Sequence, residues 1–262
     1  MTNVVRSISA SLVALAITAC ATDSALVDGK GACKQVFKGE VCTWSKAQGK
    51  NLVEVGADVP LASIENSPAE GSMAWPPVSA AVLDLPATSR QSSGLMNLTM
   101  YWEAMGHPPG PYMTPHFDFH FNVIPSADIA AIDCKDESKP GALPAGYGLI
   151  DVKLPPDMAK ATGVGTLVGL CVPGMGMHSL LTSEMESKDP FRGSMVVGYY
   201  HGKPIFIEPM LTKAMLMEKK SFDLAIPDVP GLAVAHPTKF HAEFDATKQS
   251  YRFVFSDFKP AA

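Results

Sequence analysis

Residues 106–121 read GHPPGPYMTPHFDFHF, and the last six of them alternate between a polar side chain and phenylalanine. Successive side chains of a β-strand point to opposite faces, so this stretch predicts a strand with two unlike faces. One face carries His116, Asp118 and His120, and the other carries three phenylalanines, Phe117, Phe119 and Phe121. The phenylalanine face is expected to anchor the strand in a core, while the polar face is expected to hold metal-ligand or acid–base chemistry.

The rest of the chain favours short strands joined by turns. Its 262 residues include 22 prolines and 21 glycines, which are scattered and not clustered. Residues 95–104 predict a strand just before the histidine stretch, and two hairpins are expected, over residues 194–208 and 238–258. The expected fold class is mainly β, an antiparallel sandwich or barrel with a few short helices. Such helices are expected at 126–135 and, from the helical spacing of its methionines and leucine, at 209–219.

The N-terminus predicts export. Arg6 precedes an apolar run of about ten residues, 8–17, which is shorter than the roughly 20 residues that span a bilayer. The run ends in Ile-Thr-Ala-Cys, which resembles a bacterial lipobox, so residues 1–19 are expected to be a signal peptide and Cys20 the site of lipid attachment. An ordinary signal peptide followed by an incidental cysteine is the alternative. The expected location is the bacterial cell envelope, on the periplasmic side, with the membrane as a partner through the lipid.

The domain organisation predicted after the leader is simple. Residues 20–32 are small and polar and indicate a tether, and residues 33–262 show no fixed-period repeat and indicate a single β-rich domain. Four cysteines remain besides Cys20, an even number that suits two disulfides in an exported protein, namely Cys33, Cys42, Cys134 and Cys171. Three pairings are open. A four-cysteine zinc site is disfavoured because the chain has no CxxC spacing.

Several classes of function are disfavoured. The net charge is −5 and the sequence has no run of Lys or Arg, so it lacks the basic patch that a nucleic-acid partner requires. It also has no GxSxG, P-loop or HExxH motif. His201, His236 and His241 are expected at the surface.

The spacing of the polar face limits how it can hold a metal ion. Residues two apart on a strand lie roughly 6.7 Å apart and residues four apart roughly 13 Å, whereas a zinc–nitrogen bond is about 2.0–2.1 Å. His116 with Asp118, or Asp118 with His120, therefore makes a chelating pair. All three share one ion only through a bulge, or if Asp118 orients a ring instead of binding. His107, His178 and Glu208 are the expected further ligands of a divalent metal, with zinc first and iron, manganese or copper as alternatives.

Three stretches resemble an uncharacterised bacterial family of exported, β-rich domains, typified by a Thermus protein under extracytoplasmic sigma-factor control. They are WEAMGHPPGPYMTPHFDFHF, VPGMGMH and YYHGKPIFIEPM. The likeness extends over roughly residues 55–260, with PHFDFHF as its most specific part. It implies a β-rich fold and a histidine-rich site at His107, His116, Asp118, His120, His178 and Glu208, and it implies no activity. The HxDxH stretch is also similar to cupins, but the cupin HxH spacing is absent here.

Three functions follow as hypotheses. The first is an exported lipoprotein whose divalent metal activates water or dioxygen for chemistry on a small molecule, with Glu208 as ligand or general base. The second is a non-catalytic module that sequesters metal or a small ligand. The third is a self-associating envelope protein, a homo-oligomer in which His116 and His120 only make hydrogen bonds.

Overall fold

The structure is a computed structural model that describes residues 25–71 and 74–260, and its strands form antiparallel sheets. One sheet has six strands in the order β1 (Leu26–Val36), β2 (Gly39–Gln48), β3 (Asn51–Pro60), β15 (Ser250–Lys259), β14 (His236–Asp245) and β13 (Phe222–Ala225). The other has seven in the order β4 (Ala81–Asp84), β5 (Asn97–Glu103), β6 (His116–Asn122), β12 (Lys203–Thr212), β11 (Gly193–Tyr200), β10 (Met177–Leu181) and β7 (Tyr147–Gly148). The expected mainly β, antiparallel fold is confirmed.

The remaining elements are short. A two-stranded ribbon pairs β8 (Val152–Lys153) with β9 (Thr166–Leu167). The helices are α1 (Leu61–Glu65), α2 (Ala87–Ser93), α3 (Ser126–Ala130), α4 (Pro156–Thr162), α5 (Thr182–Met185) and α6 (Lys213–Leu216). Single 3₁₀ turns occupy Gly110–Tyr112 and Val168–Leu170. Over residues 25–71 and 74–260, no helix has both the length and the apolar character needed to cross a membrane.

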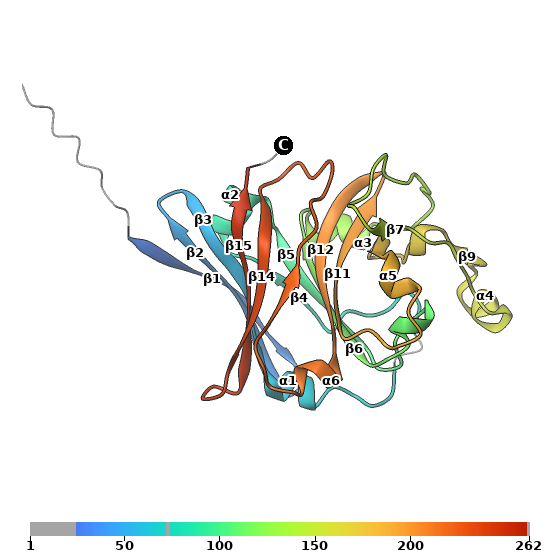
Figure 1. Ribbon diagram of the computed structural model, residues 1–262, viewed down its shortest axis with the longest axis horizontal. Helices are drawn as coiled ribbons and strands as arrows, with labels where there is room; N and C mark the ends of the chain where they lie inside the picture. The colour runs from blue at the N-terminus through green and yellow to red at the C-terminus, as the bar shows by residue number, and fades with distance from the viewer. Residues whose placement is uncertain (1–24, 72–73, 261–262) are drawn as a thin grey trace, which may run out of the picture.

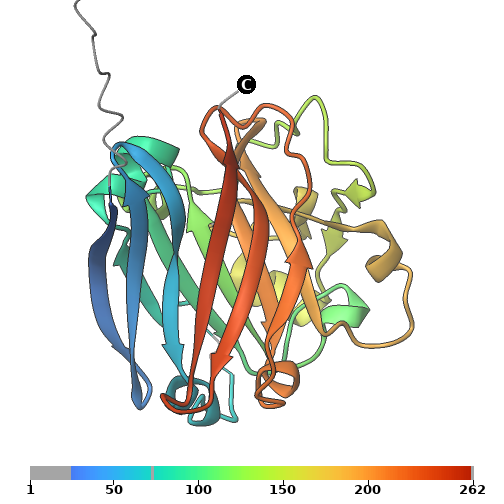
Figure 2. The same cartoon turned by 60° about the vertical axis from the view of Figure 1, so that its left-hand side comes forward.

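The two large sheets face each other across a core to which β6 contributes its phenylalanines (Figures 1 and 2). The Phe119 ring meets the Phe253 ring of β15 edge-on with centroids 4.9 Å apart, and Phe121 meets Phe255 at 4.7 Å. Edge-to-face contacts of this kind stabilise aromatic pairs beyond the area that they bury. The predicted phenylalanine face of β6 therefore lies between the sheets.

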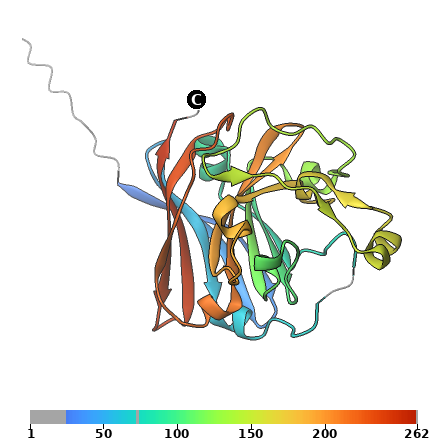
Figure 3. The ribbon, with the colours of Figure 1, turned by 45° about the vertical axis from the view of Figure 1, so that its right-hand side comes forward.

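A second layer covers the opposite face of the seven-stranded sheet. It contains α3, α4, α5 and the β8–β9 ribbon with their connecting loops (Figures 1 and 3). A separate apolar cluster joins this layer to the sheet, made of Tyr112, Ile129, Ile132, Leu154, Leu167, Leu170, Leu180, Phe191, Val196, Ile205, Phe206 and Met210. Because the layer lies over β6, the polar face of that strand is buried too.

The structure contains one of the three possible disulfide pairings, Cys33–Cys42 with Cys134–Cys171. Cys33–Cys42 joins paired positions of β1 and β2 in the six-stranded sheet. Cys134–Cys171 spans 37 residues and ties together two loops of the covering layer.

Two predictions about individual segments are wrong. Residues 26–32 of the expected tether belong to β1, where small residues serve packing: a Cβ on Gly31 would lie 2.0 Å from Thr43 Oγ1. The expected signal peptide, the expected lipid-attachment residue Cys20 and the start of the expected tether lie outside the described residues. The expected helix at 209–219 is also wrong over its first residues, because β12 continues to Thr212 and only Lys213–Leu216 are helical.

Candidate metal centre

The polar face of β6 is buried and regular. Its three predicted residues, His116, Asp118 and His120, are exposed by 0%, 4% and 1%. The pairing of β6 with β5 runs without a register shift from Asn97 opposite Asn122 to Glu103 opposite His116. Because β6 contains no bulge, the three side chains do not converge on one ion. They divide between two groups.

We call the first group the inner triad: His120, His178 and Glu208. One ligand atom from each residue lies within 4.8 Å of the others, and all three residues are buried. Neighbouring strands bring Glu208 beside His120, with His120 Nε2 and Glu208 Oε2 3.5 Å apart. His178 comes from β10, three strands beyond β6 and two beyond β12.

Phe206 packs against both histidines of the inner triad, whose own rings lie 5.5 Å apart. Its ring stacks on His120 with centroids 4.2 Å apart and lies 5.2 Å from the ring of His178. Residue 198 lies opposite both Phe206 and His178 and is glycine. A Cβ there would lie 2.0 Å from the Phe206 ring, so Gly198 makes this arrangement possible.

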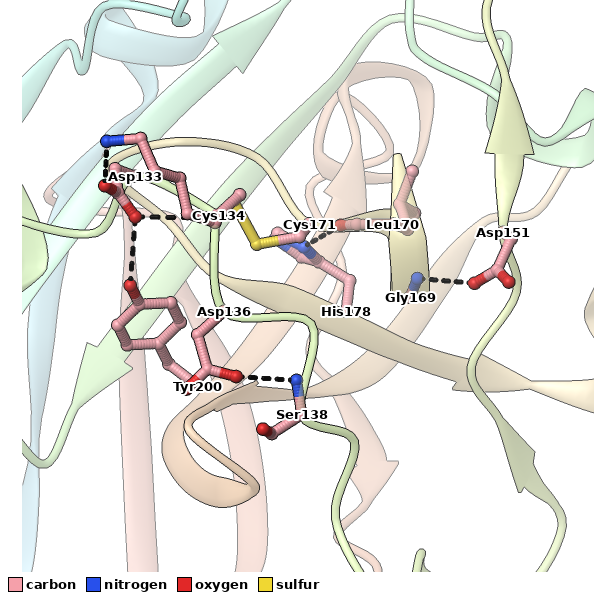
Figure 4. The surroundings of a disulfide bond; sticks show 11 residues. Asp133, Cys134, Asp136, Ser138, Asp151, Gly169, Leu170, Cys171, His178 and Tyr200 are labelled. Atoms are coloured by element: carbon pink, nitrogen blue, oxygen red, sulfur yellow. Dashed lines mark hydrogen bonds and ion pairs between the residues drawn. A yellow bond between two sulfur atoms is a disulfide. The ribbon is translucent and has the colours of Figure 1, made fainter. Parts of the chain in front are cut away.

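A backbone carbonyl orients His178. Its Nδ1–H donates to the oxygen of Leu170 over 3.1 Å (Figure 4), which leaves the lone pair of Nε2 for the triad. Burial, reinforced by the neighbouring His120, lowers the pKa of His178 to about 3, so its ring is neutral at ordinary pH. A neutral imidazole is the form that binds metal.

The loop that carries this carbonyl is held on both sides. Gly169 donates its backbone N–H to Asp151 Oδ1 over 2.7 Å, and Cys171 is bonded to Cys134 (Figure 4). Lys139 in turn contacts Asp151 at 2.9 Å. Leu170 thus links this loop of the covering layer to a ligand residue of the inner triad by a hydrogen bond.

We call the second group the outer triad: His107, His116 and Asp118. Its ligand atoms also lie within 4.8 Å of one another. His116 donates Nδ1–H to the oxygen of Thr114 over 2.6 Å, and His107 donates Nδ1–H to the oxygen of Pro108 over 2.9 Å. In the neutral form of each ring, these bonds leave the Nε2 lone pair available to a metal. His107 is half-buried, so this group lies nearer to solvent than the inner triad.

Four atoms of the two triads lack hydrogen bonds. Among the described residues, His116 Nε2, Asp118 Oδ1, His120 Nε2 and Glu208 Oε2 are fully buried without a hydrogen-bond partner. His116 Nε2 lies 3.2 Å from Asp118 Oδ1, within ion-pair distance but without hydrogen-bond alignment. Leaving such atoms unsatisfied is costly, and a cation bound in each triad would satisfy the two atoms of that triad.

The two carboxyl groups respond differently to burial. Burial raises the pKa of Glu208 above its usual value. It acts in the same direction on Asp118, but the neighbouring His116, His107 and His120 together outweigh it and lower the pKa of Asp118 to about 2. Asp118 therefore stays ionised under all ordinary conditions.

β5 adds two groups that were not predicted as part of the site. The ring of Tyr101 lies 5.1 Å from that of His120, and its hydroxyl donates to the oxygen of Gly174 over 3.3 Å. Glu103 is half-buried opposite His116, and burial together with Asp118 raises its pKa to about 7. The alternation of residues 97–103 placed both side chains on one face, but the sequence did not show that β5 lies beside β6. A cavity of about 180 Å³ borders Tyr101.

The other histidines lie elsewhere. His201 is exposed and contacts Asp136, and His241 is half-buried with its side chain 45% exposed and contacts Asp223, as expected for surface residues. His236, also expected at the surface, is 7% exposed and donates Nε2–H to the oxygen of Pro227 over 2.9 Å, so that prediction is wrong.

Comparisons of this chain with protein-family models, with curated proteins and with solved structures found no match. The likeness to a family of exported domains stays a prediction. The site is therefore interpreted from its own geometry.

Proposed function

We propose that this protein is an exported, lipid-anchored metalloprotein that holds a divalent transition-metal ion in the inner triad and uses it for chemistry on a small molecule. One observation carries the proposal: His120 Nε2 and Glu208 Oε2 are fully buried, 3.5 Å apart, and lack hydrogen-bond partners among the described residues. Burial of such atoms is explained if an ion completes their coordination.

The donor set narrows the identity of the ion. Two imidazoles and one carboxylate suit zinc, iron, manganese and copper, and they disfavour calcium and magnesium, which take oxygen ligands. Zinc is the first choice. Catalytic zinc sites commonly use three protein ligands and keep a further position for water, which the metal makes acidic enough to act as a nucleophile near neutral pH.

The location in the cell envelope is supported by sequence and by cysteine chemistry. The N-terminal leader and its lipobox-like end favour export and a lipid anchor at Cys20. Two disulfides are what a protein from an oxidising compartment is expected to contain.

Burial of the ligands favours a second candidate, a module that binds metal without turnover. His120, His178 and Glu208 are exposed by only 1%, 7% and 1%, beneath a covering layer that excludes solvent. A fully enclosed ion with no exchangeable ligand would serve storage or sequestration. An accessible coordination position separates the two candidates.

Metal analysis tests the proposal. Elemental mass spectrometry on gel-filtered protein is expected to find near-stoichiometric metal in the wild type and at least one equivalent less in His178→Ala. His241→Ala is the matched control, because the side chain of that histidine is 45% exposed and lies on the six-stranded sheet. Equal metal content in wild type and His178→Ala, with both folded by circular dichroism, would overturn the proposal.

A cobalt-substituted sample separates catalytic from closed coordination. Azide is expected to shift the visible absorption of the cobalt protein if a coordination position is open. An unchanged spectrum at saturating azide supports the binding module instead.

A further inference from the structure

The outer triad repeats the composition of the inner triad. Each contains two histidines and one carboxylate, and each presents ligand atoms within 4.8 Å of one another. In the outer triad, backbone carbonyls of Thr114 and Pro108 accept the Nδ1–H groups of His116 and His107. These bonds fix the tautomer that offers Nε2 to a metal.

One ion cannot serve both triads. Ligand bonds of about 2.0–2.2 Å place two ligand atoms of one ion within roughly 4.4 Å. His116 and His120 are four residues apart on a strand paired without a register shift, which separates their backbones by roughly 13 Å. Asp118 lies between them on the same face and is grouped with His116.

We propose that His107, His116 and Asp118 form a second divalent transition-metal site, so that β6 carries two ions side by side on its polar face. This inference rests on the proposed function of the inner triad. Its independent support is that His116 Nε2 and Asp118 Oδ1 are fully buried and unsatisfied, at a separate place on the strand.

The outer ion is the exchangeable one. His107 lies in the loop between β5 and β6 and is half-buried, as is the neighbouring Glu103 of β5, whereas every ligand of the inner triad is buried. A chelator in solution therefore reaches the outer ion first, and release of metal takes place in a fast phase and a slow phase.

The simplest alternative is an ion pair without metal. Protonated His116 and ionised Asp118 compensate each other's charge at 3.2 Å, and Asp118 raises the pKa of His116 even though burial alone would lower it. In that case the outer triad takes up no metal, and its mutation leaves the metal content unchanged.

Counting ions in two single variants tests the second site. Protein loaded with excess zinc, then gel-filtered, is expected to hold two equivalents in the wild type and one each in His107→Ala and His178→Ala. Met105→Ala is the control for the loop, since Met105 is 70% exposed. Asp118→Asn, which keeps the shape of the side chain, is a second outer variant and is also expected to hold one equivalent.

The possible results distinguish failure of the second metal site from failure of the proposed function of the inner triad. One equivalent in the wild type, lost in His178→Ala and kept in both His107→Ala and Asp118→Asn, overturns the second site and leaves the proposed function intact. No metal in any folded sample overturns both.

Discussion

His178 donates its Nδ1–H to the carbonyl oxygen of Leu170 over 3.1 Å. Leu170 directly precedes Cys171, whose disulfide with Cys134 ties the loop to another segment of the covering layer. A proposed metal ligand is thus oriented by a backbone group whose loop is tied by a disulfide. Interactions that orient a ligand in this way typically alter metal affinity 10- to 100-fold.

Removing that link should weaken metal binding. We expect Cys134→Ser/Cys171→Ser to lower the zinc affinity of the inner triad by about tenfold or more, because the Leu170 carbonyl no longer holds the His178 ring in one orientation. Competition with a chromophoric chelator measures the change. Cys33→Ser/Cys42→Ser is the control, since that disulfide joins β1 to β2 in the six-stranded sheet. Equal affinities in the two double variants would show that the disulfide has no role in positioning the ligand.

Glu208 is expected to lower the stability of the metal-free protein and to be required for metal binding. At pH 8 we expect Glu208→Gln to raise the free energy of unfolding of the metal-free protein by about 1–3 kcal/mol, because it removes a buried charge whose Oε2 lacks a partner. Its amide can also donate to His120 Nε2. The same change should abolish the rise in melting temperature that zinc produces through the inner triad. Urea unfolding with and without zinc measures both effects, and a less stable metal-free variant would contradict the prediction.

The opposite face of β6 should affect stability alone. We expect Phe119→Leu to lower the free energy of unfolding by about 1–3 kcal/mol, because its ring packs against Phe253 in the core between the sheets. Metal content should stay at the wild-type value. Denaturant unfolding measures the loss of stability, and elemental analysis of the same sample measures the metal content. Loss of metal in a folded Phe119→Leu protein would mean that the two faces are not independent.

His236 should make stability depend on pH. Burial lowers its pKa, with a smaller opposing effect from its hydrogen bond to Pro227, so the folded protein keeps the ring neutral. Below about pH 6.5 the unfolded chain takes up a proton that the folded chain does not, and stability falls as the pH decreases from there. His236→Gln keeps a donor for Pro227 and does not titrate. The stability of the wild type relative to this variant is therefore expected to fall between pH 7.5 and 5, and parallel curves for the two proteins would contradict the prediction.

The strict alternation of residues 116–121 was enough to predict the two faces of β6, because the period of a strand is set by its backbone alone. It also showed that His116 and His120 cannot share one ion without a bulge. The division into an inner and an outer triad was not predictable. It depends on which strands flank β6, and the chain reaches β12 only about 80 residues later.

The helix predicted at 209–219 shows where local spacing misleads. Met210 and Leu211 are spaced as in an amphipathic helix, yet they belong to a strand that lies between β6 and β11 and is buried on both faces. Pairing with two neighbouring strands outweighs the local preference of these residues for a helix. Helical geometry begins only after Thr212, whose hydroxyl accepts the backbone N–H of Met215 over 3.2 Å.

The most direct test is an anomalous difference map from crystals of zinc-loaded protein, with data collected on both sides of the zinc absorption edge. We predict one peak bounded by His120, His178 and Glu208 and a second bounded by His107, His116 and Asp118. A map without a peak at the inner triad, in crystals shown to contain stoichiometric zinc, would contradict the central claim.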